Sequence, residues 1–296
     1  MRRPPPLSQF PDFPVIGGTA LAALAVTLPN LLGGVDLSRL DMDGHAMHGE
    51  PWRLITCTLP HAGALHLVFN LYWLWSMGTL VEQNLGHLRT AGLMALFAVV
   101  SMGSEWGLLG SAIGLSGVVY GLFGLLWMLS TRDPRFLGAM DPQTVRLMVG
   151  WFFLCIVLTV TNLLPVGNVA HGAGCLAGIL AGIALSPKAA ERSLGSLGLS
   201  ALTCVTLLVA GPARRYVNFS SQGYVGPFQM GYEALKANRA AEALPYLQEA
   251  VAMAPNQAVC WHDLGVAYAR LGREQEAEAA VVHAHQLAPS DPDFGL

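Results

Sequence analysis

Apolar segments of about the length of a membrane span recur along most of the chain. A helix needs about 20 apolar residues to cross a bilayer, and seven segments approach or reach that length: 14–33, 64–82, 91–109, 115–130, 147–164, 169–186 and 196–211. The stretch 34–61 is too polar to cross and long enough to hold a folded element at the membrane surface. The pattern predicts an all-α, polytopic membrane helical bundle of seven spans, some of them short.

The amino-acid composition supports the prediction of a membrane protein and argues against nucleic acid as a partner. Of the 296 residues, 53% are hydrophobic and only 12% are charged, and no soluble core requires so apolar a chain. The net charge of −3 says little about partners. Because no basic patch with interleaved aromatic residues occurs, we expect the lipid bilayer as a partner and not nucleic acid.

The cysteines do not indicate a disulfide framework. None of the five has CxxC spacing, and three lie in predicted spans, where cysteine usually acts as a small apolar residue. A bridge between Cys57 and Cys260 is the alternative, if both face an oxidising compartment.

The basic residues predict the orientation. The start, two arginines followed by three prolines, resembles a signal-peptide n-region, but no small-x-small cleavage site follows, so we expect a retained first span. Cytoplasmic loops carry an excess of Lys and Arg. A cytoplasmic N-terminus puts eight inside (Arg2, Arg3, Arg89, Arg132, Arg135, Arg146, Lys188, Arg192) and four outside (Arg39, Arg53, Arg214, Arg215), apart from the C-terminal segment. Arg214 and Arg215 oppose this orientation; if they prevail, segment 196–211 does not cross.

A serine and a histidine stand at the starts of two predicted spans. Residues 114–124 read Gly-Leu-Ser-Gly-Val-Val-Tyr-Gly-Leu-Phe-Gly, with Ser116 at the mouth of an apolar helix, and His171 opens another. Polar side chains are costly within a bilayer and usually mark a functional site. Under the predicted topology both lie near the outer side, so the simplest partner for each is the other.

Glycine stripes support the pairing of these two helices. Small residues at helical spacing allow membrane helices to approach closely, as a base within about 3 Å of a hydroxyl requires. The stripes are Gly117, Gly121 and Gly124 on one helix and Gly174, Gly178 and Gly182 on the other. Ordinary membrane packing is the alternative explanation for either stripe alone.

Further polar groups suit an acyl-transfer site. Ser116 lies in a first helical turn, where unpaired N–H groups can stabilise an oxyanion. Tyr120 follows one turn later on the same face and could pack against the imidazole. His66 and Asn70 share one face of another span and can both donate, although such a pair can also simply bridge two helices.

These motifs in combination resemble the rhomboid intramembrane serine proteases over roughly residues 14–186. The matching segments are Trp52-Arg53, His61 to Asn70, Glu82, Gly114-Leu-Ser116-Gly117 with Tyr120, and Ala170-His171-Gly-Ala-Gly174. Glycine-framed serines also occur in soluble hydrolases, so the order of motifs across successive spans carries the resemblance.

The resemblance implies roles for individual residues. Ser116 is expected as the nucleophile and His171 as the general base, with no acidic third member. His66, Asn70 and the Ser116 backbone N–H are expected to form an oxyanion hole, supported by Gly114, while Tyr120 orients His171. Trp52, Arg53, His61 and Glu82 match structural positions. The expected substrate is a single-span membrane protein with a helix that unwinds near its outer end, and no cofactor or metal is implied.

The segment after the core predicts a repeat domain. A 34-residue period pairs Gly231 with Gly265, Ala243 with Ala277, Ala250 with Ala284 and Pro255 with Pro289, and Trp261-x-x-Leu-Gly-x-x-Tyr268 resembles a tetratricopeptide repeat. Pro227 stands where the first copy would have its Trp. Two repeats form a small module that needs support from the membrane domain, a partner or another copy; an ordinary helical hairpin pair is the alternative.

The complete prediction is a six-span rhomboid-like core plus a seventh span. Its parts are a cytoplasmic segment (1–13), a protease domain (14–186), a seventh span with linker (187–225) and a repeat domain (226–296). We expect a multi-pass protein of the bacterial inner membrane whose active site opens to the extracytoplasmic side, where water enters along irregular residues 103–115.

Other function classes fit less well. A non-proteolytic membrane adaptor that binds client helices and recruits partners has no use for Ser116 or His171. A transporter couples ions through buried carboxylates, and we expect no span to carry a buried carboxylate of that kind. The histidines His45, His48, His283 and His285 lack a matching ligand set for a metal site.

Overall fold

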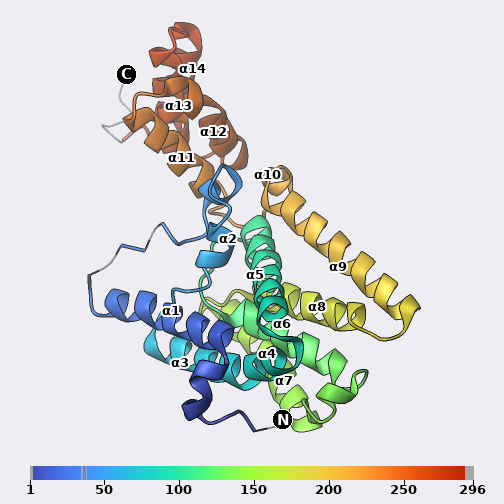
Figure 1. Cartoon of the computed structure of the whole chain (residues 1–296). Helices are drawn as coiled ribbons and strands as arrows, with labels where there is room; N and C mark the ends of the chain where they lie inside the picture. The colour runs from blue at the N-terminus through green and yellow to red at the C-terminus, as the bar shows by residue number, and fades with distance from the viewer. Residues whose placement is uncertain (1–2, 35, 38, 291–296) are drawn as a thin grey trace.

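The computed structural model describes residues 3–34, 36–37 and 39–290, and all its regular elements are helical (Figure 1). Arg2, counted above, and residues 291–296 of the expected repeat domain lie outside the described residues. The elements up to the seventh span are η1 (Leu7–Asp12), α1 (Pro14–Leu31), η2 (Gly44–Met47), α2 (Arg53–Thr56), α3 (Ala64–Trp73), the π-helix η3 (Leu74–Gly78), α4 (Thr79–Leu85), α5 (His87–Leu108), α6 (Ser116–Leu129), η4 (Pro134–Phe136), α7 (Pro142–Val160), α8 (Asn168–Ala184) and α9 (Ala189–Ala210).

Within the described residues, seven apolar helical units match the predicted spans and confirm the fold class. Five are long and apolar enough to cross a membrane, namely α1, the continuous unit α3–η3–α4, α5, α7 and α9, and α6 and α8 are shorter. Some helices begin earlier than hydropathy predicts. At the start of α7, the Asp141 side chain accepts the Thr144 N–H at 2.8 Å. This N-cap stabilises a first turn of polar residues that a search for apolar segments leaves out.

Helix α6 forms the centre of the bundle. Nearly all of its side chains are buried, with Leu122, Leu125 and Leu126 completely so. Helices α1, α7 and α9 have few buried side chains, and large apolar residues such as Phe153 and Leu197 are exposed on them. This distribution is typical of a bundle whose outer helices face lipid.

The glycine stripes pack differently from one another. On α8, a Cβ added at Gly174 would lie 2.1 Å from the carbonyl oxygen of Gly117, and one at Gly178 would lie 1.9 Å from that of Gly121. The stripe of α8 therefore touches the α6 backbone, as predicted. On α6, however, Cβ atoms at Gly117 and Gly121 would meet Ser101 and Phe97 of α5. Gly124, by contrast, lies against the backbone of Cys175 and Ile179 of α8. The two stripes therefore face each other only in part, and Gly117 and Gly121 also admit α5.

Two carboxylates within spans are buried, and both cap other helices. Glu82 of α4 and Glu105 of α5 are 2% and 6% exposed. Glu82 accepts the N–H groups of Val15 and Ile16 at 2.9 and 3.0 Å, and Glu105 accepts that of Ala170 at 2.8 Å. Each carboxylate thus caps the N-terminus of another helix, which favours negative charge. Their role is structural, and an ion-coupling site does not follow from them.

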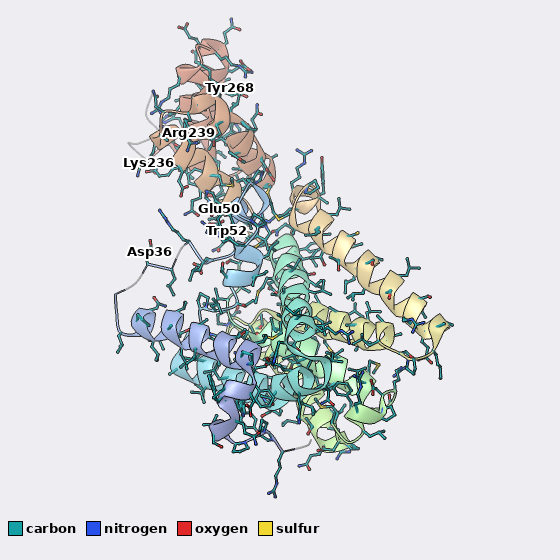
Figure 2. All side chains as sticks on the ribbon, viewed as in Figure 1. Asp36, Glu50, Trp52, Lys236, Arg239 and Tyr268 are labelled. Carbon is teal, nitrogen blue, oxygen red and sulfur yellow. The ribbon has the colours of Figure 1, made fainter. Side chains whose placement is uncertain are left out.

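The segment 34–61 holds the folded element that its length predicts. Arg53 is 6% exposed and pairs with Glu50 at 2.5 Å and Asp43 at 3.0 Å, which fixes η2 against α2. Trp52 is 52% exposed on the same element. Figure 2 shows Glu50 and Trp52 below the C-terminal helices. This surface element packs through Leu54 on Met102 and Trp106 of α5.

Helix α9 returns the chain to the end of the bundle where α6 and α8 begin. Its start packs on α8, with Gly195 against the Ala184 backbone, and its end packs on α5, with Gly107 against Val209. Since α5 ends at Leu108, just before the loop that leads into α6, the end of α9 lies on the Ser116 side of the bundle. Figure 1 shows α9 running along the outside of the bundle to α10 (Arg214–Val217).

The last four helices form two equivalent hairpins, as the 34-residue period predicts. They are α11 (Val225–Lys236), α12 (Ala240–Met253), α13 (Ala258–Arg270) and α14 (Glu274–Leu287). A Cβ at Gly231 would lie 3.4 Å from the Ala243 carbonyl oxygen, and one at Gly265 would lie 3.2 Å from that of Ala277. The paired sequence positions thus make the same contact in both copies. The module leans on the surface element, where His45 pairs with Glu233 of α11 at 3.4 Å.

Candidate active site

Ser116 is the first residue of α6 and is partly exposed. The preceding Gly114 has φ +103°, a conformation that favours glycine, and a Cβ there would lie 2.7 Å from Cε1 of His66. Glycine at this position therefore brings the chain against the His66 ring as it turns into the serine helix. Only residues 109–115 are irregular; residues 103–108, expected in the water path, belong to α5.

His61 holds the residue that precedes the serine. Its Nδ1 lies 2.9 Å from the Leu59 carbonyl oxygen and must donate to it, so Nε2 is left to accept the Leu115 N–H at 3.3 Å. Cys57 adds a second tether, because its carbonyl accepts the Gly114 N–H at 3.1 Å. The loop before Ser116 is thus fixed by two hydrogen bonds from the segment between α2 and α3.

His171 lies in the first turn of α8 and is 4% exposed. The Tyr120 ring stacks on its imidazole with a centroid distance of 4.6 Å and an angle of 27°. The Tyr120 hydroxyl donates to the Met148 carbonyl at 3.1 Å, which ties this ring to α7. Nδ1 of His171 is buried and has no hydrogen-bond partner among the described residues. Stacking, and not a carboxylate, restrains the imidazole.

The expected oxyanion donors His66 and Asn70 lie one turn apart on α3, which contacts α6. Asn70 is 2% exposed, and one N–H of its amide donates to the His66 carbonyl at 2.9 Å. The His66 ring meets that of His61 edge to face at 4.9 Å. The amide is therefore held in a fixed orientation by its own helix, and the His66 ring is held between His61 and Gly114.

Glu105 is a site-supporting residue that sequence reasoning missed. It caps α8 one residue before His171, where Gly167 at the N-cap offers no side chain. The available signal was a carboxylate within an apolar segment, which is costly unless it has a partner. Its partner, a backbone N–H 65 residues away, cannot be seen in the sequence.

The remaining candidates lie elsewhere. All five cysteines are free, with Cys57 and Cys260 buried. His45 and His48 contact the repeat domain, and His283 packs on Trp261 at 4.4 Å. The described residues contain no group of three or more His, Cys, Asp or Glu that could hold a metal ion.

Acid should destabilise the protein through His61. Burial lowers the pKa of His61 to about 4, with a smaller contribution from His66, whereas an unfolded histidine titrates near 6.5. Between pH 6.5 and 4 the unfolded chain therefore binds a proton that the folded chain does not. As the pH is lowered through this range, the free energy of unfolding decreases by on the order of 3 kcal/mol. Thermal unfolding of the detergent-solubilised protein across this range measures the fall.

Two variants test whether His61 causes this pH dependence of stability. His61→Gln should flatten the dependence between pH 6.5 and 4, while His283→Gln, altered in the repeat domain, should retain the wild-type slope. Equal slopes in all three proteins would assign the acid sensitivity to other groups.

Comparison with known proteins agrees with this architecture. The family model described as a rhomboid domain matches residues 48–188, and a tetratricopeptide repeat model matches residues 234–295. Rhomboid protease GlpG of Photorhabdus laumondii is 34% identical over 151 residues, which are 49% of this chain and 51% of that protein. GlpG of an Enterobacter species is 31% identical over 162 residues, 51% of this chain and 54% of the relative.

A third relative extends further along the chain. Rhomboid protease GluP of Bacillus subtilis is 26% identical over 250 residues, 82% of this chain and 47% of that protein. The chain therefore spans about half the length of the curated relatives it matches.

Proposed function

Since the chain carries a rhomboid domain followed by a tetratricopeptide repeat, as its motifs predict, we propose that it is an intramembrane serine endopeptidase. The observation that carries the proposal is the backbone contact between α6 and α8. Gly117, directly after the serine, touches Gly174, three residues after the histidine. This contact joins the first turn of the helix that bears Ser116 to the second turn of the helix that bears His171.

In the proposed reaction Ser116 is the nucleophile and His171 the base. His171 takes the hydroxyl proton while Oγ attacks the carbonyl carbon of a substrate peptide bond. Collapse of the tetrahedral intermediate breaks the C–N bond, and His171 returns the proton to the leaving amine. Water then hydrolyses the acyl-enzyme by the same route. Nδ1 of His171 has no hydrogen-bond partner within the described part of the chain. This supports a dyad, because a triad would place a carboxylate there.

An oxyanion hole from His66, Asn70 and the Ser116 N–H completes the proposal. We expect Asn70→Ala to lower the rate by about 10²–10³-fold, as loss of one oxyanion donor does in soluble enzymes, and His66→Ala to resemble it. Cleavage of a model transmembrane substrate measures the loss. Asn84→Ala is the control, since Asn84 makes the same bond to its own helix at the opposite end of the unit. Equal rates in Asn70→Ala and Asn84→Ala would contradict the donor role.

The proposed substrate is a single-span membrane protein. A peptide bond must leave its helix before Ser116 can reach it, so small or helix-breaking residues near the outer end should favour cleavage. Water must also reach the site. Irregular backbone at membrane depth is tolerated where it lines a wet cavity, and residues 109–115 directly before Ser116 are the irregular segment here.

We propose a multi-pass protein of the bacterial inner membrane, with Ser116 and the repeat domain both extracytoplasmic. A cysteine introduced by Ser290→Cys, beyond α14, with Cys260→Ala in the background, should react with an impermeant thiol reagent on intact cells. Thr131→Cys, in the exposed turn after α6, should react only after lysis. The reverse pattern would invert the topology, and protection of both would contradict the seven-span arrangement.

The alternative is a non-proteolytic adaptor that binds client helices and recruits a protein partner through the repeats. The partly exposed Ser116 at a helix N-terminus favours the protease. A fluorophosphonate probe separates the two, because an activated serine reacts covalently and an adaptor contains none. Absence of both labelling and cleavage in the reconstituted wild-type protein would support the adaptor.

A further inference from the structure

The last turn of α5 is capped by the linker that follows the seventh span. A helix leaves its last four carbonyls without partners in its own helix. In α5 the first of these, from Glu105, accepts the N–H groups of Leu109 and Gly110. The other three accept hydrogen bonds from residues 214–219, more than 100 residues later in the chain.

Three linker residues make these bonds. The Trp106 carbonyl accepts from Arg214 Nε at 3.2 Å and from Asn218 Nδ2 at 3.3 Å. The Gly107 carbonyl accepts from Asn218 Nδ2 at 3.1 Å, and the Leu108 carbonyl accepts the Phe219 N–H at 2.7 Å. The linker therefore supplies the whole C-terminal cap that α5 itself cannot.

Arg214 is unusually well placed for this function. It is 5% exposed, and its guanidinium lies 3.8 Å from the centroid of the Trp106 ring. Burial lowers the pKa of Arg214 to about 10, so it is still charged at neutral pH. A cation at a helix C-terminus is favoured by the helix dipole, and the α5 carbonyls supply the negative end.

The same linker is joined to the repeat domain. Arg214 Nη1 donates to the Gly223 carbonyl at 2.8 Å, two residues before α11 begins. Gly226 of α11 lies against Trp106, since a Cβ there would be 2.8 Å from Cη2 of the indole. Movement of α11 would therefore disturb the contacts of Trp106 and Arg214.

The same turn of α5 also contacts the helix that bears His171. Glu105 precedes Trp106, and its carboxylate caps α8 through Ala170, the residue before His171. Contacts thus run without interruption from α11 through Arg214 and Trp106 to Glu105, and from there to the first turn of α8.

We propose that Arg214 and Glu105 are positioning residues for His171, and that the seating of the repeat domain on α5 thereby sets the catalytic rate. The assignment of His171 as base rests on the proposed function. Neither side chain needs to touch the substrate. Release of the linker frees the end of α5, Glu105 shifts, and α8 loses the cap that fixes its first turn.

The test uses the full chain with two independent measurements. Hydrogen exchange reports protection of the amides of residues 169–171, and cleavage kinetics report kcat and KM. Glu105→Ala and Arg214→Met should both deprotect these amides and lower kcat by roughly 10–10²-fold, as a displacement of about 1 Å can. KM should stay near the wild-type value. Glu105→Gln, whose amide oxygen can still accept from Ala170, should restore most of the rate.

Matched controls separate positioning from stability. Arg215→Met removes the neighbouring arginine, which is exposed and bonds to Tyr216, and should behave as wild type. Glu82→Gln weakens the equivalent cap on α1. It should lower the thermal midpoint without changing the hydrogen-exchange protection of the amides of residues 169–171. The double variant Glu105→Ala/Arg214→Met should be no slower than the slower single variant, because residues acting in series are not additive.

Two results would overturn the link: unchanged protection and kcat in both single variants, or losses that multiply in the double variant. The proposed function fails separately. If the wild-type protein neither cleaves nor labels, the exchange measurement still decides whether Arg214 and Glu105 hold α8.

Discussion

Ser116→Ala and His171→Ala should each abolish cleavage of a model transmembrane substrate, with a loss of at least about 10⁴-fold. Members of a nucleophile–base pair act as a unit, so removing either costs nearly as much as removing both. Cleavage in proteoliposomes and fluorophosphonate labelling measure the loss. Labelling should disappear completely in Ser116→Ala, because the reacting oxygen is gone, and should slow strongly in His171→Ala.

A neighbouring serine provides the control for this experiment. Ser111 lies in the irregular segment directly before α6 and is exposed, so Ser111→Ala should keep both cleavage and labelling. Ser116→Ala and Ser111→Ala should unfold near the wild-type temperature, because both serines are at least partly exposed, whereas His171→Ala loses the imidazole that stacks on Tyr120 and should unfold somewhat earlier while still folding. Full activity in either Ser116→Ala or His171→Ala would eliminate the dyad, and labelling that survives in Ser116→Ala would place the nucleophile elsewhere.

Local spacing was sufficient to predict much of the arrangement. Tyr120 follows Ser116 by one turn, and its ring does stack on His171. The 34-residue period predicted four helices whose glycines make equivalent contacts in both copies. Such features depend on helical periodicity, which a sequence contains directly. The roles of the site residues remain proposals.

Contacts between distant segments could not be predicted in the same way. Glu105 caps a helix that begins more than 60 residues later, and residues 214–219 cap a helix that ends more than 100 residues earlier. Nothing in the local sequence identifies those partners. Glu82 and Glu105 illustrate this limit: a carboxylate in an apolar segment needs a partner, and the N–H groups that serve here belong to helices more than 60 residues away in the sequence.

The glycine stripes combine a feature that the sequence predicts, their helical spacing, with one that it does not, the identity of the helices they contact. Spacing correctly indicated that α6 and α8 have bare faces for close packing. It could not indicate which neighbour each face admits, because α6 is surrounded by several helices. Gly121 admits Phe97 of α5, which is fully buried, so Gly121→Val would displace an aromatic ring and would not test the contact with α8 directly.

Gly174→Ala tests the contact between α6 and α8 directly, and we expect it to remove most of the activity. The added methyl group would lie 2.1 Å from the Gly117 carbonyl oxygen and 3.0 Å from its carbonyl carbon. Both atoms belong to the backbone, so no side-chain rotation relieves the clash and the helices must separate. A shift of about 1 Å between positioned groups can cost about 10²-fold in rate, and overpacking typically costs about 1–3 kcal/mol of stability.

Gly172→Ala is a control on the same turn of α8. Its methyl group would meet only Phe152, at 3.7 Å, which is ordinary van der Waals contact. Both substitutions replace glycine by alanine within a helix and gain roughly the same 0.5–1 kcal/mol of helix propensity, so the pair differs mainly in the clash. Gly172→Ala should be as active and at least as stable as wild type. If Gly174→Ala matches it in kcat and thermal midpoint, the backbone contact with Gly117 does not set the distance between Ser116 and His171.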